Sequence, residues 1–148
     1  MTTSPASPAS PSFPTTPDEF NAFQKGTLPD LLGVAVSRVD AAGVHATLQI
    51  QAHHLAPNKF LHAATVVMLA DTCCGYGCLA QLPDGASGFT TIELKSNHLG
   101  TATSGTISCI ATPAHLGRST QVWDATVFSP GGKAIALFRC TQMILWSR

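Results

Sequence analysis

Charged residues are scarce in this chain. Lysine and arginine together number 8 among 148 residues, aspartate and glutamate also number 8, and the formal net charge is zero. Such a chain has no basic patch for a phosphate backbone or for an acidic membrane surface. The composition therefore predicts neither a nucleic-acid partner nor a membrane partner. Because 45% of the residues are hydrophobic, we expect part of the apolar surface to be covered by a second copy of the chain.

Long uninterrupted apolar runs and a secretion signal are also lacking. Asp71 and several glycines interrupt the most apolar stretch, and a membrane-spanning helix needs about 20 predominantly apolar residues. The N-terminus has no basic segment followed by an apolar one, which is the pattern of a signal peptide. These two features predict a cytoplasmic protein. The length of the chain predicts one domain with a substantial core.

An even set of cysteines is lacking too, which argues against a disulfide framework and for a reducing compartment. The five cysteines are Cys73, Cys74, Cys78, Cys109 and Cys140. Cys74 and Cys78 lie four residues apart on one helical face, a spacing compatible with a metal site. No His or Cys partners follow at the spacing of zinc ligands. We therefore expect no metal, and we interpret the cysteines as small buried hydrophobic residues.

The N-terminal segment differs in composition from the rest of the chain. Residues 1–16 are mostly Ser, Thr, Ala and Pro, with proline at every third position from Pro5 onward. This pattern predicts an extended, disordered arm, so we assign the folded domain to residues 17–148. A capping box from Thr16 to Glu19 predicts a short helix that reaches about Lys25 and ends at Gly26. We expect its two phenylalanines, three residues apart, to attach this helix to the body.

Six segments have the pattern of β-strands. The second segment alternates strictly, because Val44, Ala46, Leu48 and Ile50 are apolar and the residues between them are mostly polar. The predicted strands are residues 34–39, 44–51, 89–97, 104–113, 119–128 and 133–145, with turns at Gly100, around His115-Leu116-Gly117 and at Ser129-Pro130-Gly131-Gly132. Between the second and third strands lies one long apolar stretch. This order predicts an α+β fold in which an antiparallel sheet wraps around a long central helix.

The long apolar stretch begins after the loop that contains Asn58 and runs from His62 to Leu82. Its alanines and leucines favour a helix, and its apolarity predicts that the helix is buried. Asp71 is its only charged residue. A carboxylate in such a helix is costly unless it is paired or used. The helix alone leaves both readings open: Asp71 could pair with an arginine, or it could be the reactive group.

His62 and Asp71 are nine residues apart. A helix separates such positions by about 13 Å and places them on opposite sides. One chain therefore cannot bring Asp71 to its own helix N-terminus, but a two-fold dimer with neighbouring antiparallel helices can. We expect the free N–H groups of Ala63 and Ala64 to polarise a carbonyl there.

The chemistry that suits this arrangement is acyl transfer to water. Asp71 would activate water as a general base or attack the carbonyl itself, and a thioester suits a carboxylate because a thiolate leaves without a strong acid. The chain has no Gly-x-Ser-x-Gly elbow for a serine hydrolase. We expect His62 to orient the loop by hydrogen bonding, and not to act as the base. Asn58 could be an ordinary turn residue, and Gly117 to Thr120 could be a plain turn with a solvated arginine.

His62-Ala63-Ala64 followed by Leu69-Ala70-Asp71-Thr72 resembles the His-Gly-Gly…Leu-Ala-Asp-Thr pattern of hotdog-fold acyl-CoA thioesterases, with the same spacing of nine from His to carboxylate. Within that family the chain is similar to the PaaI-like and 4-hydroxybenzoyl-CoA thioesterases. Residues 90–97, 116–124 and 132–136 also resemble segments of the family, in the same order, and the likeness extends from about Leu32 to Leu145.

The resemblance implies a site and an assembly. Asp71 would be the catalytic carboxylate, the residue after the histidine, Ala63, would give the oxyanion N–H, and Asn58 would contact the thioester or its water. Thr91 would orient water. The resemblance also implies contacts with substrate or its coenzyme A portion at Ala64, Lys95, Asn97, Gly117, Arg118, Ser119 and Thr120. It implies a homodimer or a dimer of dimers, hence a homotetramer, and no cofactor, since coenzyme A enters as part of the substrate.

Two departures from the family pattern concern the reaction. Ala63 and Ala64 replace the two glycines, and their methyl groups narrow the approach to the backbone. Gly75 stands where some relatives have a hydroxyl. An alternative function is therefore a non-catalytic acyl-CoA-binding hotdog protein. A hotdog hydratase would need an Asp and a His close together in one loop, and the sequence has no such pair.

Overall fold

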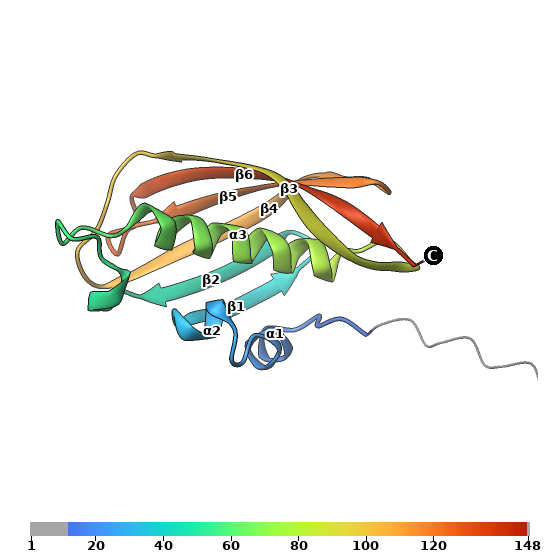
Figure 1. Cartoon of the computed structure of the whole chain (residues 1–148), viewed down its shortest axis with the longest axis horizontal. Helices are drawn as coiled ribbons and strands as arrows, with labels where there is room; N and C mark the ends of the chain where they lie inside the picture. Colours follow the sequence, from blue (N-terminus) through green and yellow to red (C-terminus); the bar gives the residue numbers. More distant parts are fainter. Residues whose placement is uncertain (1–11, 148) are drawn as a thin grey trace, which may run out of the picture.

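The computed structural model describes residues 12–147 and contains one sheet with a long helix against it (Figure 1). In chain order the elements are α1 (Pro17–Phe23), α2 (Leu28–Leu31), β1 (Val34–Asp40), β2 (Gly43–Gln49), a 3₁₀ turn η1 (Ala52–His54), α3 (Ala63–Ala80), β3 (Ala86–His98), β4 (Thr106–Leu116), β5 (Thr120–Phe128) and β6 (Ala134–Trp146). The six predicted strands and the two predicted helices are all present. The sequence analysis missed α2 and η1, which are each shorter than five residues.

The six strands form one sheet in the order β1-β2-β4-β5-β6-β3, and every neighbouring pair is antiparallel. Figure 1 shows the sheet curving around α3, with α1 and α2 beside the β1–β2 end. The predicted α+β fold is therefore confirmed. The chain crosses from the end of α3 to the opposite edge of the sheet, so β3 pairs only with β6 and its other edge has no strand partner within residues 12–147.

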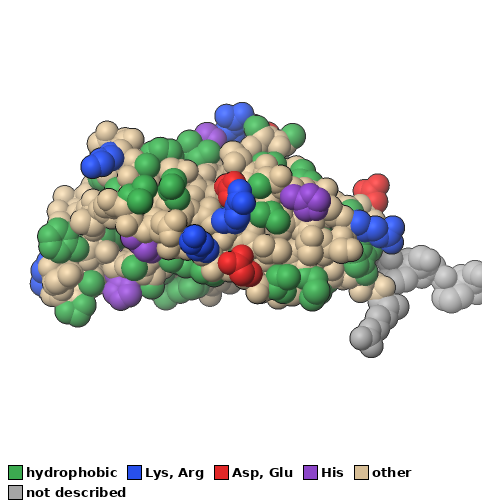
Figure 2. Space-filling view, turned by 90° about the horizontal axis from the view of Figure 1, so that it is seen from above, with side chains coloured by type: hydrophobic (Ala, Val, Ile, Leu, Met, Phe, Trp, Pro, Cys, Tyr) green, Lys and Arg blue, Asp and Glu red, His purple; other side chains and the backbone are tan. Residues whose placement is uncertain are grey.

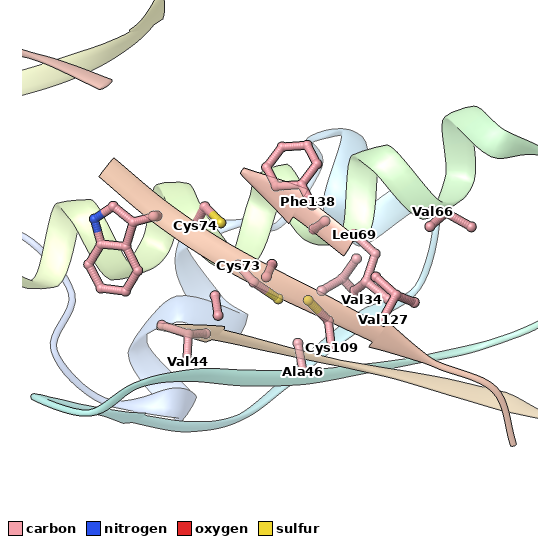
Figure 3. Close-up of a cluster of buried hydrophobic side chains, with 14 of the residues drawn as sticks. Val34, Val44, Ala46, Val66, Leu69, Cys73, Cys74, Cys109, Val127 and Phe138 are labelled. Atoms are coloured by element: carbon pink, nitrogen blue, oxygen red, sulfur yellow. The ribbon is translucent and has the colours of Figure 1, made fainter. Parts of the chain in front are cut away.

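Helix α3 provides the centre of the core. Its buried side includes Leu69, Cys73 and Cys74, which pack on inward-facing residues of the strands such as Ala46 and Cys109 (Figure 3). All five cysteines are fully buried and free, as expected for small hydrophobic residues. Close packing of helix against sheet also needs small residues on α3. A Cβ atom at Gly77 would lie 2.4 Å from the buried ring of Trp123.

One expectation about α3 is wrong. We expected no apolar run of membrane-spanning length, but the 18 residues of Ala63–Ala80 have a mean hydropathy of 1.4 and are long and apolar enough to cross a membrane by length and composition. A core helix passes the same test, and 56% of this one is buried inside the protein. Asp71 and the glycines do not lower the mean hydropathy of this helix enough to exclude membrane-spanning character by composition.

The predicted capping box begins α1: the Thr16 hydroxyl accepts a hydrogen bond from the Glu19 amide. The helix ends at Phe23, two residues earlier than predicted. Phe20 is fully buried as expected, but Phe23 is 57% exposed, so the expectation that both rings attach α1 to the body is wrong for Phe23. The predicted arm lies mostly outside the described residues, which begin at residue 12; within it, Phe13 is partly buried against the core.

Strand boundaries differ from the predicted ones by a few residues. Strand β3 begins three residues earlier than predicted, at Ala86. Strand β4 continues three residues further, to Leu116, so His115 and Leu116 pair with β5 instead of forming the predicted turn. A register shift between Pro113 and His115 accompanies this extension. Proline has no N–H for the ladder, so the irregularity lies where a continuous pairing would leave a gap.

Candidate active site

Asp71 lies in the middle of α3 and faces a cavity of about 320 Å³. One of its carboxylate oxygens, Oδ1, is buried and has no hydrogen-bond partner among residues 12–147. Burial raises the pKa of Asp71 above its ordinary value of 3.8, because the charged form loses hydration. No arginine or lysine of the described chain forms an ion pair with it. The structural reading, in which Asp71 pairs with an arginine, therefore finds no support within residues 12–147.

The walls of this cavity come from three parts of the chain. Helix α3 contributes Asp71, Thr72, Gly75, Tyr76 and Leu79, strand β3 contributes Gly88, Phe89 and Thr91, and the N-terminal helices contribute Phe23 and Pro29. Thr91, a predicted site residue, thus shares a cavity with Asp71. Most of the remaining wall is aromatic or aliphatic. The arrangement is a carboxylate at the side of an apolar chamber.

The sequence analysis missed the aromatic part of this chamber. Tyr76 and Phe89 were not assigned to the site. Gly75 and Leu79 follow Asp71 by four and eight residues, which places them on the same helical face. That periodicity was the available signal. Burial raises the pKa of Tyr76 to about 12, so its hydroxyl stays protonated and donates to Gln24 Oε1 at 2.9 Å.

The N-terminus of α3 differs in one respect from expectation. His62 is the N-cap, and its Nδ1 accepts a hydrogen bond of 2.9 Å from the Ala64 N–H. The expectation that the Ala64 N–H is free is therefore wrong, because the histidine side chain caps it. The Ala63 N–H has no acceptor among residues 12–147. His62 thus has a hydrogen-bonding role at this end, and Ala63 retains the available donor.

Asp71 and the helix N-terminus do not meet within one chain. The cavity beside the N-terminus has a volume of about 360 Å³ and is lined by His62, Ala64 and Met68, with His53 and several leucines. It has no lining residue in common with the cavity beside Asp71. This separation follows from the nine-residue spacing on a straight helix.

The other predicted site residues lie outside the Asp71 cavity. Asn58 is in the exposed loop before α3, where its Oδ1 accepts from the Phe60 amide at 3.2 Å, as a turn residue does. Arg118 follows β4 and lies over the Trp146 ring, 4.7 Å from the ring centroid. Gly117 and Arg118 line a separate cavity of about 250 Å³, and Ser119 and Thr120 follow directly, at the start of β5.

Lys95 and Asn97 lie on the outer face of the sheet, in a groove of about 440 Å³. Their cross-strand partners are Arg139 and Leu137, which are both exposed. Arg139 in turn donates from Nη2 to an Asp124 oxygen at 2.7 Å. One chain thus brings Asp71 and Thr91 together and leaves the other predicted site residues in separate places.

The buried cysteines have no reactive or metal-binding arrangement. Within residues 12–147, no group of three or more His, Cys, Asp or Glu side chains could hold a metal ion. The neighbouring Cys140 thiol and burial raise the pKa of Cys74, and burial raises the pKa of Cys78 to about 12. Thiols with such pKa values stay protonated and are poor nucleophiles.

Proteins that are similar to this chain in sequence and fold include thioesterases. The family model of the thioesterase superfamily matches residues 58–136, which is more than half of the chain, so the chain belongs to that superfamily. The 1,4-dihydroxy-2-naphthoyl-CoA hydrolase of Escherichia coli is 26% identical over 131 residues, covering 86% of this chain and 93% of the relative.

Two solved structures agree with this assignment. A thioesterase from Haemophilus influenzae is 26% identical, with a TM-score of 0.82, and the match covers 92% of this chain and 93% of the other. A mutant thioesterase from Pseudomonas aeruginosa is 28% identical, with a TM-score of 0.81, and the match covers 87% and 93%. The chain has the hotdog fold of these enzymes and is a thioester hydrolase.

Proposed function

We propose that this enzyme hydrolyses the thioester of an acyl-CoA, with Asp71 as the catalytic carboxylate. The observation that carries the proposal is the unpartnered, half-buried carboxylate of Asp71 at the wall of an apolar cavity. A buried carboxylate without a partner costs stability, and groups with perturbed pKa values gather at functional sites. The apolar walls suit an acyl group, whereas the polar coenzyme A portion would extend outward.

In the general-base form of the reaction, Asp71 takes a proton from water. The water oxygen forms a bond to the carbonyl carbon, the C–S bond breaks, and coenzyme A leaves as a thiolate that is then protonated. A raised pKa makes the ionised carboxylate a stronger base. In the nucleophilic form, a carboxylate oxygen of Asp71 bonds to the carbonyl carbon, the C–S bond breaks and coenzyme A leaves as a thiolate. Water then hydrolyses the acyl-enzyme anhydride to the free acid and the Asp71 carboxylate. Incorporation of oxygen-18 from solvent into Asp71 in a single turnover would identify the second form.

The oxyanion would be held by the Ala63 N–H of a second copy of the chain. Within one chain the cavity beside Asp71 contains no residue of the α3 N-terminus, where Ala63 lies, and a dimer with antiparallel α3 helices would bring the two together. Strand β3 supports such an assembly, because its free edge could pair with another strand and its Ile92 and Leu94 are exposed. Hydrophobic side chains are scattered over the face seen in Figure 2, between several charged groups. We therefore propose a homodimer, or a homotetramer built from two dimers.

The other predicted residues receive supporting roles in this proposal. Thr91 would orient water, since it shares the cavity with Asp71. His62 and Asn58 would hold the loop and N-cap beside the partner's substrate. Lys95, Asn97 and the segment from Gly117 to Thr120 would bind the coenzyme A portion; the exposed guanidinium of Arg118 is suited to a phosphate.

We further propose a cytoplasmic enzyme that needs no cofactor. The five cysteines are free, which is typical of a reducing compartment. The thiolate leaving group needs no strong acid, so a carboxylate, water and an amide donor are sufficient for the reaction. The scarcity of charge supports the absence of nucleic-acid and membrane partners.

A second candidate is an acyl-CoA-binding protein without turnover. The capped Ala64 N–H favours it, because only one of the two expected amides remains for the oxyanion. One oxyanion donor is typically worth about 3–4 kcal/mol of barrier. This candidate would be favoured if the protein bound an acyl-CoA and the concentration of the intact thioester stayed constant over hours.

The test is release of free coenzyme A thiol from acetyl-, hexanoyl- and benzoyl-CoA. We expect turnover by the unmodified enzyme and a loss of about 10²–10⁴-fold in Asp71→Asn, the usual contribution of a general base. Asp84→Asn is the matched control, because Asp84 is an exposed carboxylate in the turn after α3. Equal rates in Asp71→Asn and the unmodified enzyme would reject Asp71 as the catalytic group.

A further inference from the structure

Phe23 is a large apolar side chain in an unusual position. It is the last residue of α1, it is 57% exposed, and it lines the cavity that contains Asp71. Its neighbour Phe20 on the same short helix is fully buried. Phe23 also lies before residues 58–136, the part that matches the thioesterase superfamily. This wall of the chamber is therefore built by a part of the chain outside the matched family segment.

Several contacts hold α1 in a fixed position over α3 and β1. The Phe20 ring stacks on Tyr76 with 4.6 Å between ring centroids. Gln24 is 3% exposed; its Oε1 accepts from the Tyr76 hydroxyl and its Nε2 donates to the Val34 carbonyl at 2.6 Å. Asn21 exchanges two hydrogen bonds of 2.9 Å with the backbone of Val36. The position of Phe23 is thus set by its helix, although its own ring is exposed.

Another part of the chamber wall is the ring of Phe89, which lies beside Gly75. A Cβ atom at Gly75 would lie 3.1 Å from the Phe89 ring, so the glycine lets that ring lie close against α3. The hydroxyls near the chamber are already used in part: Tyr76 donates to Gln24, and Thr72 donates to the Met68 sulfur at 3.6 Å. A group that enters the chamber lined by Phe23 and Phe89 therefore meets mainly aromatic and aliphatic surface.

We propose that Phe23 is a specificity-determining residue that covers the acyl group of the substrate, and that it selects an apolar, ring-bearing acyl group over a short one. Aromatic walls favour an aromatic ring through offset or edge-to-face contacts as well as through burial. Phe23 would lose its exposed area when such a group binds. Gln24 and Tyr76 are positioning residues for this wall. The proposal rests on the proposed function, since it concerns the acyl group beside Asp71.

The experiment measures kcat and KM for acetyl-CoA and benzoyl-CoA with Phe23→Ala, Phe23→Tyr and Leu31→Ala. Leu31 is the matched control, because it is 76% exposed on the neighbouring helix α2 and does not line the chamber. We expect Phe23→Ala to lower the ratio of kcat/KM for benzoyl-CoA over acetyl-CoA by about tenfold or more, mainly through KM. Phe23→Tyr keeps the ring and should keep the ratio, as should Leu31→Ala.

A ratio that stays unchanged in Phe23→Ala, or that falls equally in Leu31→Ala, would overturn the proposal. A higher rate with hexanoyl-CoA than with benzoyl-CoA in the unmodified enzyme would overturn the preference for a ring. Binding separates this proposal from the proposed function: a non-hydrolysable thioether analogue of benzoyl-CoA is titrated calorimetrically against the same variants. If the unmodified enzyme releases no thiol, a weaker Kd in Phe23→Ala alone still supports the role of Phe23, and an equal Kd rejects it.

Discussion

The strongest prediction concerns two variants that are inactive alone and active together. Ala63→Pro removes the amide proposed for the oxyanion, and Asp71→Asn removes the proposed base. Proline is tolerated at the first position of a helix, and the residue before it must be extended. Ala63 is the first residue of α3, and His62 has φ −68° and ψ 135°, so the substitution fits the backbone. The hydrogen bonds of the next helical turn do not use the Ala63 N–H.

The size of the effect follows from the two-fold arrangement. Each homodimeric variant lacks one component at both sites, and we expect each to lose about 10²-fold or more in kcat. A mixed dimer contains one site with both components, because the intact Asp71 of one chain meets the intact Ala63 of the other. With random pairing half of the dimers are mixed, so about one quarter of the unmodified activity should return.

The assay is release of coenzyme A thiol after co-expression of the two variants with different affinity tags and purification through both tags. The doubly purified mixed dimer should reach about half of the unmodified activity per dimer. Proteins purified separately and mixed on ice for a short time serve as the control for slow exchange. If the mixed dimer is as inactive as its parents, both components act within one chain and the shared site is refuted.

The remaining predictions concern Asp71, the packing of α3 and the support of α1. Burial raises the pKa of Asp71 in the folded state above 3.8. The folded protein therefore loses stability as the pH rises from 3.8 through the folded-state pKa. Asp71→Asn should raise the urea midpoint at pH 7 and leave it nearly unchanged below pH 3.8. Because the reaction needs the ionised carboxylate, kcat/KM should decrease as the pH is lowered. The midpoint of that decrease should lie above pH 3.8, the ordinary pKa of an aspartate. Gly77→Ala should cost about 2 kcal/mol in thermal or urea unfolding, because the added methyl meets Trp123; a gain would show that the ring moves freely. Tyr76→Phe should cost about 1–3 kcal/mol, since it leaves the buried Gln24 Oε1 without its donor, and an unchanged midpoint would contradict this.

Local patterns in the sequence were sufficient for most of the fold. The alternation from Val44 to Ile50 predicted β2 and its buried face, and those four residues are all buried. The capping box at Thr16 predicted the start of α1. These signals depend on neighbours within a few residues, and the folded structure preserves such neighbours.

The errors about individual side chains of the site and of α1 depend on contacts between distant or competing groups. The sequence analysis treated the Ala64 N–H as free, but this N–H donates a hydrogen bond to His62 Nδ1. The residue types alone do not indicate the side-chain rotamer of His62 that makes this bond. Phe20 and Phe23 looked equivalent, yet only Phe20 meets Tyr76, 56 residues later in the chain. The residues expected to bind coenzyme A lie on three separate surfaces of one chain. Only a second copy of the chain could bring these surfaces together at one site.

The sequence by itself determined which elements form and which side chain on the apolar helix carries the charge, because periodicity and composition act within single segments. Only the tertiary structure decided that this carboxylate lacks a partner within residues 12–147, that an exposed aromatic ring from the first helix forms a wall beside it, and that the first strand after the long helix lies at an open edge of the sheet. Burial and exposure are properties of surfaces that meet in space, and the chain order alone does not specify which surfaces meet.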